Sequence, residues 1–270
     1  MAEPTFDRAR FTALLTTRFL GRHLVARAEV GSTNDLAWEA LAAGAPDGTT
    51  VVADAQTRGR GRAGRRWHQT PGEGLALSVL LHAGCDRRSL GVLPLAAGLA
   101  LAQALERVGV RAGLKWPNDV LMEGRKLAGI LCESRGGSGA DTAGEAVVIG
   151  VGVNVGGDRA SFPEALRDTA TSLAAEGFAV ERETVAAQFL NVLEPLWATL
   201  QEGAREAVLE AWRLRAGFWG RPVRVRTLAG EVSGVARTLD SDGGLVLALA
   251  SGAETTVRAG DLELVPAEPR

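Results

Sequence analysis

Tyrosine is absent from this 270-residue chain, and cysteine, lysine and methionine occur twice each. It contains two cysteines, Cys85 and Cys132, without a Cys-x-x-Cys pair, which argues against a disulfide framework or a zinc knot. No apolar run reaches the length of a membrane span, because Gly, Pro or a charge interrupts each one. The N-terminus lacks the basic-then-apolar order of a secretory signal. We therefore expect a cytoplasmic protein that does not bind membranes.

The charge balance is close to neutral, which limits the classes of partner. The formal net charge is −2 at pH 7 and the isoelectric point is about 6.0, which argues against a general binder of nucleic acid. With 46% hydrophobic and 23% charged residues, the composition is that of a soluble globular protein. A chain of this length can bury about 73% of its extended surface, which is enough for a core without disulfides.

Lysine occurs at two positions, Lys115 and Lys126, and because Lys plus Arg total 30, the other 28 basic residues are arginines. Surface cations tolerate an exchange of Lys for Arg, whereas a site that needs a compact three-donor ammonium does not. Both lysines lie in the segment 115–129. This segment is therefore the strongest candidate for chemistry, although two residues are few.

Hydrophobic periodicity predicts an α/β protein with a β-rich C-terminal part. Helices are expected at 6–20, 36–44, from Pro94 to about Arg107, at 183–202 with a kink at Pro195, and at 204–216. Strands are expected at 23–30, 49–55, 75–82, 119–122, 126–134 and 146–155, and a loop at 134–144. From Phe218 onward, short alternating runs separated by Gly and Asp turns predict a small antiparallel barrel. We place a domain boundary near Gly217.

An arginine-rich segment, Arg58 to Trp67, contains the pattern G-x-G-x-x-G at positions 59, 61 and 64. A dinucleotide-binding turn of this pattern opens a helix, whereas here the chain continues as loop into a strand. Five arginines within nine residues repel one another unless an anion lies among them, and their forks match phosphate or carboxylate oxygens. A solvated basic loop is the alternative, but in a slightly acidic chain so local a cluster favours an anionic ligand.

The lysine segment supports a functional and a structural interpretation. Lys126 follows the turn at 123–125 and is either a cation shared between two anionic reactants or a solvated hairpin lysine. Trp116 and Pro117 predict a tight turn with a packed indole, and Asn118 and Asp119 offer oxygens to Mg²⁺ or to phosphate-bound water. Lys115 pairs with an acid or meets a ligand, and both alternatives stay open.

Two further segments place polar groups at the ends of predicted elements. Ser32 to Asp35 matches the helix-capping pattern S-x-x-D, and a helix start also offers free amides to a ligand. The strand 146–155 ends at Asn154, a typical position for a residue of a sheet-based site. The sequence contains no G-x-S-x-G elbow or Cys–His signature, so covalent hydrolase chemistry has no support.

Taken in order, these motifs closely resemble those of the biotin–protein ligases. The resemblance covers about residues 28–265, and GRGRxGRxW with KWPND and KLAGIL is highly specific. It rests on Ser32-Thr33-Asn34, Gln56, the segment 59–67, Lys115 to Asp119, Lys126 to Leu131 and Gly150 to Asn154.

The resemblance implies a catalytic domain over residues 1–217, of α/β class with a mixed sheet, related to class II aminoacyl-tRNA synthetases. It also implies a small C-terminal SH3-like β-barrel over residues 218–270. The implied reaction has two steps, in which biotin and Mg-ATP give biotinyl-5′-AMP and pyrophosphate, and a lysine of a biotin carboxyl carrier protein then accepts the biotin. The implied substrates and cofactors are biotin, ATP and Mg²⁺.

The resemblance also assigns roles to residues of this chain. Lys126 would bridge the biotin carboxylate and the α-phosphate, and Arg60 and Arg62 would close over the adenylate, which gives the catalytic group. The implied biotin site consists of Ser32, Thr33, Asn34, Gln56, Arg60, Gly61, Arg62, Lys126 and Gly129. The implied ATP and adenylate site consists of Arg62, Arg65, Trp67, Lys115, Asn118, Lys126 and Asn154, with Asp119 as the expected Mg²⁺ ligand.

The chain departs from the family pattern at two points. Transcription-repressing members carry a winged helix before the catalytic domain. Too little chain precedes the first motif here to hold one, so we expect a ligase without sequence-specific DNA binding. Those members also place a Trp against the adenine downstream of the Asn, where this chain has Thr169 to Leu173, which leaves the adenine contact unassigned. Their late C-terminal Arg aligns with Val265. The oligomeric state is open and a homodimer is one possibility.

Three other functions remain to be distinguished from biotin ligation. One is a biotin-binding regulator without catalysis, which would require Lys126 to be dispensable. Lipoate–protein ligases use the same adenylation logic, and the arginine loop favours biotin over lipoate. An RNA-binding module would combine the arginine loop with the terminal barrel, but the loop lacks an interleaved aromatic platform.

Overall fold

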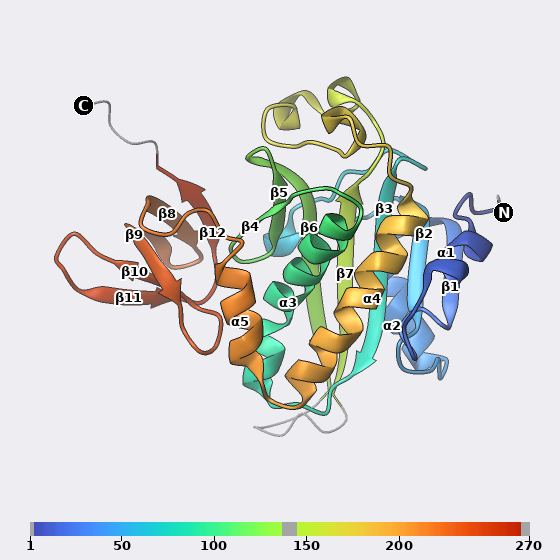
Figure 1. The fold of residues 1–270 in the computed structure, drawn as a ribbon, viewed down its shortest axis with the longest axis horizontal. Coiled ribbons are helices and arrows are strands. Elements are labelled where there is room, and N and C mark those ends of the chain that lie inside the picture. The colour runs from blue at the N-terminus through green and yellow to red at the C-terminus, as the bar shows by residue number, and fades with distance from the viewer. Residues whose placement is uncertain (1–2, 137–144, 266–270) are drawn as a thin grey trace.

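The computed structural model describes residues 3–136 and 145–265, and its larger part is built on a seven-stranded sheet (Figure 1). The strand order is β1-β2-β3-β7-β6-β5-β4. The pair β1–β2 is parallel and the remaining pairs are antiparallel, so the sheet is mixed, as predicted. The strands are β1 (Leu24–Val30), β2 (Thr50–Gln56), β3 (Gly74–His82), β4 (Gly113–Lys115), β5 (Asp119–Met122), β6 (Arg125–Arg135) and β7 (Ala146–Asn154).

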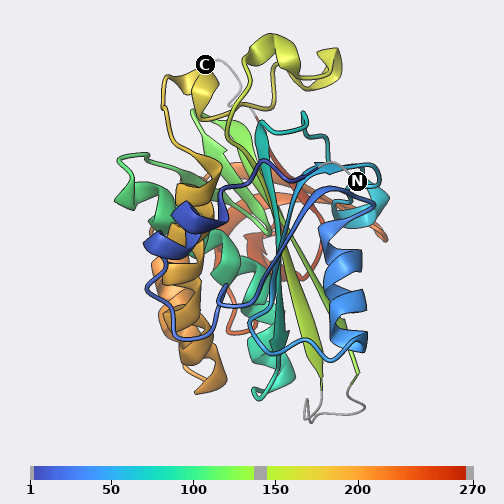
Figure 2. The ribbon, with the colours of Figure 1, turned by 90° about the vertical axis from the view of Figure 1, so that its right-hand side faces the viewer.

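Helices cover both faces of this sheet (Figure 2). The main core lies between the sheet and the helices α3 (Arg87–Arg107) and α4 (Arg182–Gln201), and α5 (Arg205–Arg213) packs beside α3. On the opposite face, α2 (Thr33–Ala42) buries Trp38 against Val51, Leu80 and Val148 of the central strands. Because both faces are covered, β3 and β7 have nearly continuous apolar sequences rather than an alternating pattern.

The C-terminal part forms a second, five-stranded antiparallel sheet, visible at the left of Figure 1. Its order is β11-β10-β9-β8-β12. It contacts the larger part through the buried Trp116, whose indole Nε1 donates to the carbonyl oxygen of Gly243 at 3.0 Å. Its strands are β8 (Pro222–Thr227), β9 (Gly230–Leu239), β10 (Leu245–Ala248), β11 (Glu254–Val257) and β12 (Asp261–Leu264).

Two predicted helix starts are wrong, and side-chain capping explains one of them. The helix expected from Pro94 begins seven residues earlier, where the Asp86 carboxylate accepts from the Ser89 amide at 2.9 Å, and Pro94 lies inside it. The helix expected at 36–44 begins at Thr33. Ser32 occupies its N-cap position, but the Ser32 hydroxyl makes no cap hydrogen bond, so the predicted capping box does not form there.

One predicted helix length and the predicted start of one loop are also wrong. The helix expected at 6–20 is α1 (Arg8–Leu14), after which the chain turns and Gly21 takes a φ of 74°. The loop expected at 134–144 starts later, because β6 continues to Arg135 through pairing with β7. Residues 137–144 lie outside the described residues. The kink expected at Pro195 stays a prediction, since α4 is continuous through that residue.

By length and composition, α3 is apolar enough to cross a membrane. In the structure it is the central core helix, and Leu93, Leu99 and Leu101 are at most 1% exposed. Burial inside the protein therefore accounts for its hydrophobicity.

Candidate active site

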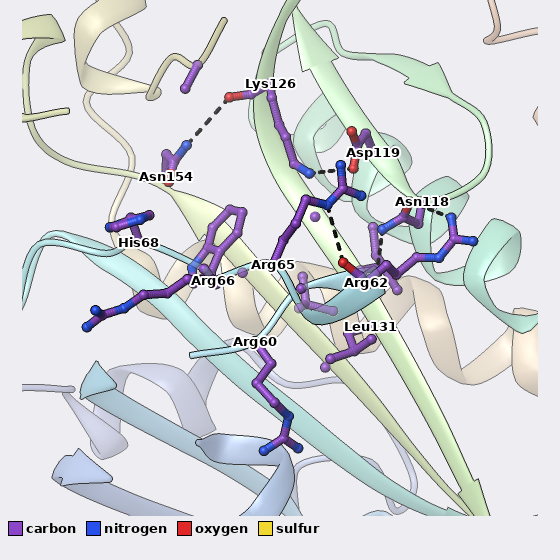
Figure 3. A pocket seen from close by; sticks show the side chains of 18 of the residues that line it. Arg60, Arg62, Arg65, Arg66, His68, Asn118, Asp119, Lys126, Leu131 and Asn154 are labelled. Carbon is purple, nitrogen blue, oxygen red and sulfur yellow. Dashed lines mark hydrogen bonds and ion pairs between the residues drawn. The ribbon is translucent and has the colours of Figure 1, made fainter. Parts of the chain in front are cut away.

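A single cavity of about 440 Å³ brings together every site residue that the sequence predicts (Figure 3). It lies where the β1–α2 turn, the end of β2, the start of β6 and the end of β7 meet. The predicted residues that line it are Ser32, Thr33, Asn34, Gln56, Arg60, Gly61, Arg62, Arg65, Trp67, Lys115, Asn118, Asp119, Lys126, Gly129 and Asn154.

A buried polar cluster forms one end of this cavity. Gln56 Oε1 accepts from the Thr33 amide at 2.9 Å and from the Thr33 hydroxyl at 3.2 Å. The Ser78 hydroxyl on β3 is within hydrogen-bond distance of Thr33 Oγ1 (2.8 Å) and Asn34 Oδ1 (2.6 Å). Thr33 and Asn34 are 4% and 3% exposed, so neighbouring groups fix their rotamers before a ligand arrives.

The floor of the cavity is made of glycines on β6 and β7. Gly129 and Gly152 are direct partners across the two strands. The Trp67 indole lies on Gly152, where an added Cβ would be 2.4 Å from Trp67 Cε2. At Gly150 an added Cβ would be 2.3 Å from Asn34 Oδ1. These positions therefore require glycine for close approach of side chains to the sheet.

Trp67 carries a signal of its own. Its indole Nε1 is buried and has no hydrogen-bond partner in the described structure. A buried donor without a partner is costly, so its position in a cavity suits an acceptor on a ligand.

Lys126 and Asp119 point toward each other in the cavity (Figure 3), with Lys126 Nζ 2.6 Å from Asp119 Oδ1. The two side chains are 34% and 19% exposed. The Lys126 ammonium also lies 6.0 Å from the centre of the Trp67 ring. Asp119 thus neutralises the lysine, and both groups line the cavity within reach of a ligand.

The segment 169–171 holds the backbone of Lys126 through two hydrogen bonds. The Lys126 amide donates to Thr169 O at 2.7 Å, and the Thr171 amide donates to Lys126 O at 2.9 Å. The Asn154 side-chain amide, 9% exposed, donates to Thr171 O at 2.9 Å. Asn154 therefore joins the end of β7 to this segment.

The arginine loop, residues 58–67, folds back on itself above the floor. The Gly61 amide donates to Arg65 O at 2.7 Å, and the Trp67 amide donates to Gly59 O at 2.9 Å. Between them a single 3₁₀ turn contains Ala63 at a φ of 53°. The loop does not open a helix, which confirms that its glycine pattern is not a dinucleotide-binding turn.

Acidic groups of the protein hold two of the loop arginines. Arg60 donates to Asp35 at 2.8 Å and to Glu133 at 3.1 Å, and these contacts turn it away from Lys126 in Figure 3. The hydrogen bond to Asp35 is the main reason that the pKa of Arg60 is raised. Arg65 pairs with Asp261 of β12 at 2.7 Å.

Arg62 lies deeper than the other loop arginines. Its Nη1 donates to Asn118 Oδ1 at 3.2 Å, while the Asn118 amide donates to Ile130 O at 2.8 Å. Burial lowers the pKa of the Arg62 guanidinium, and the Asp261 carboxylate opposes this effect. A partly desolvated cation at the wall of a cavity attracts an anion more strongly than an exposed one does.

Two families match separate parts of the chain. The Biotin/lipoate A/B protein ligase family matches residues 27–154, and the Biotin protein ligase C terminal domain matches residues 218–265. The biotin–[acetyl-CoA-carboxylase] ligase of Mycobacterium tuberculosis is 37% identical over 249 residues, covering 89% of this chain and 88% of that protein. The chain belongs to the biotin–protein ligase family.

Other members of the family extend this similarity. The bifunctional ligase/repressor BirA of Bacillus spizizenii is 34% identical over 252 residues, covering 93% of this chain and 76% of that protein. The Aquifex aeolicus biotin protein ligase in complex with biotin and ATP has a TM-score of 0.75 at 27% identity, covering 91% of this chain and all of that one. The Leishmania major enzyme with biotinyl-5-AMP has a TM-score of 0.59 at 26% identity, covering 88% and 99%.

Membership in the biotin–protein ligase family confirms the resemblance and the fold class, an α/β mixed sheet followed by an SH3-like C-terminal domain. The roles of the individual residues stay predictions. The cavity also contains residues that sequence reasoning missed. Phe162 and Leu166, from the region after β7, form an apolar wall near Asn154. Ser78 does not line the cavity itself, but its hydroxyl contacts Thr33 and Asn34. Nothing in the local sequence marks these residues, because only the fold brings them to the site.

Proposed function

We propose that this ligase builds biotinyl-5′-AMP in the central cavity and passes the biotin to a lysine of a biotin carboxyl carrier protein. The observation that carries the proposal is the convergence of fifteen predicted residues, from five stretches of sequence, on one cavity. In the first step, a biotin carboxylate oxygen attacks the α-phosphorus of ATP and the bond to pyrophosphate breaks. In the second, the lysine amine attacks the anhydride carbonyl carbon, loses a proton and releases AMP.

Lys126 has the central role because the first step brings two anions together. Its ammonium can exchange the Asp119 carboxylate for the biotin carboxylate and the α-phosphate, since Lys126 Nζ lies inside the cavity within 2.6 Å of Asp119. A fixed cation then neutralises their approach and the charge that grows on phosphorus. A point charge suits two acceptors in different directions better than a planar fork does.

Biotin occupies the end of the cavity beside α2. The buried residues Ser32, Thr33 and Asn34, together with the partly buried Gln56, offer donors and acceptors to the ureido ring. The glycine floor at Gly129 leaves room for the valeryl chain to reach Lys126.

The nucleotide occupies the opposite end, beside the arginine loop and Asn154. Asn154 faces the adenine, and Phe162 supplies an apolar surface next to it. Arg60 leaves Asp35 and Glu133 to close over the adenylate together with Arg62, which shields the anhydride from water. Arg62, Arg65, Trp67, Lys115 and Asn118 surround the phosphate region of this end.

Magnesium fits this site as a companion of ATP rather than as a resident ion. The described residues contain no group of three or more His, Cys, Asp or Glu side chains that could hold a metal. Mg²⁺ is commonly bound by one or two carboxylates together with substrate phosphates. Asp119 would supply one such carboxylate, and the ion would neutralise phosphate charge.

Other parts of the proposal stay predictions. They are the domain limits at residues 1–217 and 218–270, a cytoplasmic location, the lack of sequence-specific DNA binding and a homodimer. Light scattering after size-exclusion chromatography tests the oligomeric state.

The decisive experiment is transfer of radiolabelled biotin to a purified biotin carboxyl carrier domain, with and without ATP. We expect ATP-dependent labelling that disappears when the acceptor lysine is replaced. A thermal-shift comparison of biotin with lipoate is the matched control, and stabilisation by lipoate alone would overturn the proposal in favour of lipoate ligation. A filter-binding assay with RNA at two salt concentrations tests the non-enzymatic alternative.

A further inference from the structure

The C-terminal domain reaches the arginine loop through the start of β12. Asp261 Oδ1 accepts from Arg65 Nη2 at 2.7 Å, and Arg65 Nε donates to the carbonyl oxygen of Arg62 at 3.2 Å. The Arg65 guanidinium therefore joins a carboxylate of the C-terminal domain to the backbone of the residue that we place at the phosphate.

A second contact runs in parallel with the first. Arg62 Nη1 lies 3.5 Å from the carbonyl oxygen of Gly260, the residue before Asp261. Gly260 has a φ of 157°, and an added Cβ there would be 2.6 Å from Arg226 O, so β8 fixes the turn. Asp261 is itself paired with Arg226 in the β12–β8 register. The contact surface offered to the loop is thus part of a sheet and not a free tail.

We infer that Asp261 is a positioning residue for the adenylate-binding loop. It holds Arg65, and through Arg65 the backbone of Arg62, in the orientation that receives the nucleotide phosphate. The inference rests on the proposed function, and it assigns the C-terminal domain a part in retaining the adenylate.

The physical reason is the charge of the loop. Five arginines within nine residues repel one another, so the loop needs carboxylates to hold one conformation before a substrate anion arrives. Asp35 and Glu133 of the larger part hold Arg60 facing away from Lys126, whereas Asp261 holds Arg65 beside Arg62. The Arg65–Asp261 pair is 53% and 42% exposed, so its effect is modest.

The test compares Asp261→Asn with Glu263→Gln, measuring the rate constant for dissociation of preformed biotinyl-5′-AMP. Glu263 lies two residues further along β12 and pairs with Arg226 inside the C-terminal domain, so it matches Asp261 in strand and in charge. We expect Asp261→Asn to raise the dissociation rate about two- to fivefold, the range for an exposed ion pair. Glu263→Gln leaves the rate unchanged. An unchanged or slower rate in Asp261→Asn overturns the inference.

A double-mutant cycle separates positioning from a general loss of stability. In an Arg65→Gln background, Asp261→Asn has no further effect if Asp261 acts through Arg65. Asp261→Glu keeps the charge and restores at least half of the lost retention. Independent, multiplying effects of the two substitutions would overturn the inference. If the wild-type protein forms no adenylate, the proposed function fails; if it does and Asp261→Asn behaves like the wild type, only the positioning role fails.

Discussion

The arginine loop and the glycine floor face each other across the same cavity, but different interactions hold them. The floor belongs to the central strands β6 and β7, and Asn34 of α2, which packs on Gly150 of the floor, is 3% exposed. The loop at residues 58–67 is held by ion pairs whose side chains are 28% to 53% exposed.

This difference assigns recognition of the ligand to the floor and retention of the adenylate to the arginine loop. Buried, mutually satisfied polar groups and a packed sheet resist change, so the floor is preorganised for its ligand. Exposed ion pairs contribute about 0–1 kcal/mol each and are screened by salt, so the loop arginines can exchange a carboxylate of the protein for a phosphate of the ligand. The four predictions below test this division.

The largest effect is expected where the two regions meet, at Lys126. We expect Lys126→Arg to slow adenylate formation about 100-fold, because a planar fork does not replace a point cation between two anions. Biotin affinity changes less than threefold. Pyrophosphate release measures the first quantity and titration calorimetry the second. Arg125→Lys, outside the cavity lining, is the matched control, and pyrophosphate release at the wild-type rate in Lys126→Arg would contradict the assigned role.

A smaller effect is expected for the loop. Removing a charged donor to a phosphate costs about 1.5–3 kcal/mol, so Arg62→Ala speeds adenylate dissociation about 10- to 100-fold. Fluorescence or filter retention of preformed adenylate measures this rate. Arg58→Ala is the control in the same loop, since Arg58 does not line the cavity in the described structure. Equal dissociation rates for Arg62→Ala and wild type would rule out loop closure.

At the glycine floor, we expect added side-chain volume rather than a change of charge to reduce stability and biotin binding. In Gly150→Ala the new methyl group meets Asn34 Oδ1, so we expect a loss of about 1–3 kcal/mol in unfolding free energy and about tenfold weaker biotin binding. Gly98→Ala, on α3, has its nearest neighbour at 3.6 Å and gains about 1 kcal/mol from helix propensity. Chemical denaturation and calorimetry compare the two variants. Equal behaviour would show that the floor is not tightly packed.

The smallest effect is expected at a position outside both regions. The Ser89 amide lowers the pKa of Asp86, so the ionised cap stabilises the fold above the unfolded pKa and loses this contribution as the pH falls through the folded one. We expect Asp86→Ala to cost about 1 kcal/mol at pH 7 and progressively less below about pH 4. Asp86→Asn retains the cap. Chemical denaturation at pH 7 and below about pH 4 measures the difference in unfolding free energy. We expect adenylate retention to be unchanged in Asp86→Ala.

The sequence predicted the site better than it predicted the elements around it. The lysine segment, the arginine loop and the polar run at 32–34 all line the cavity, because their chemistry is local and distinctive. The start of α3 was wrong by seven residues, since an Asp cap upstream outweighed the proline signal. Phe162 and Leu166 were missed because apolar residues in loops and single 3₁₀ turns have no periodic pattern.

The sequence by itself determined which groups are available: two retained lysines, a cluster of arginines separated by glycines, and strands apolar enough to be buried. The tertiary structure decided which of these groups meet. Asp119 pairs with Lys126 across neighbouring strands. Asp261 contacts Arg65 across 196 positions of chain, a separation that gives no sign of contact in the sequence. The physical reason is that ion pairs and close packing depend on distances in space. These distances are set by how the two sheets and their helices pack together.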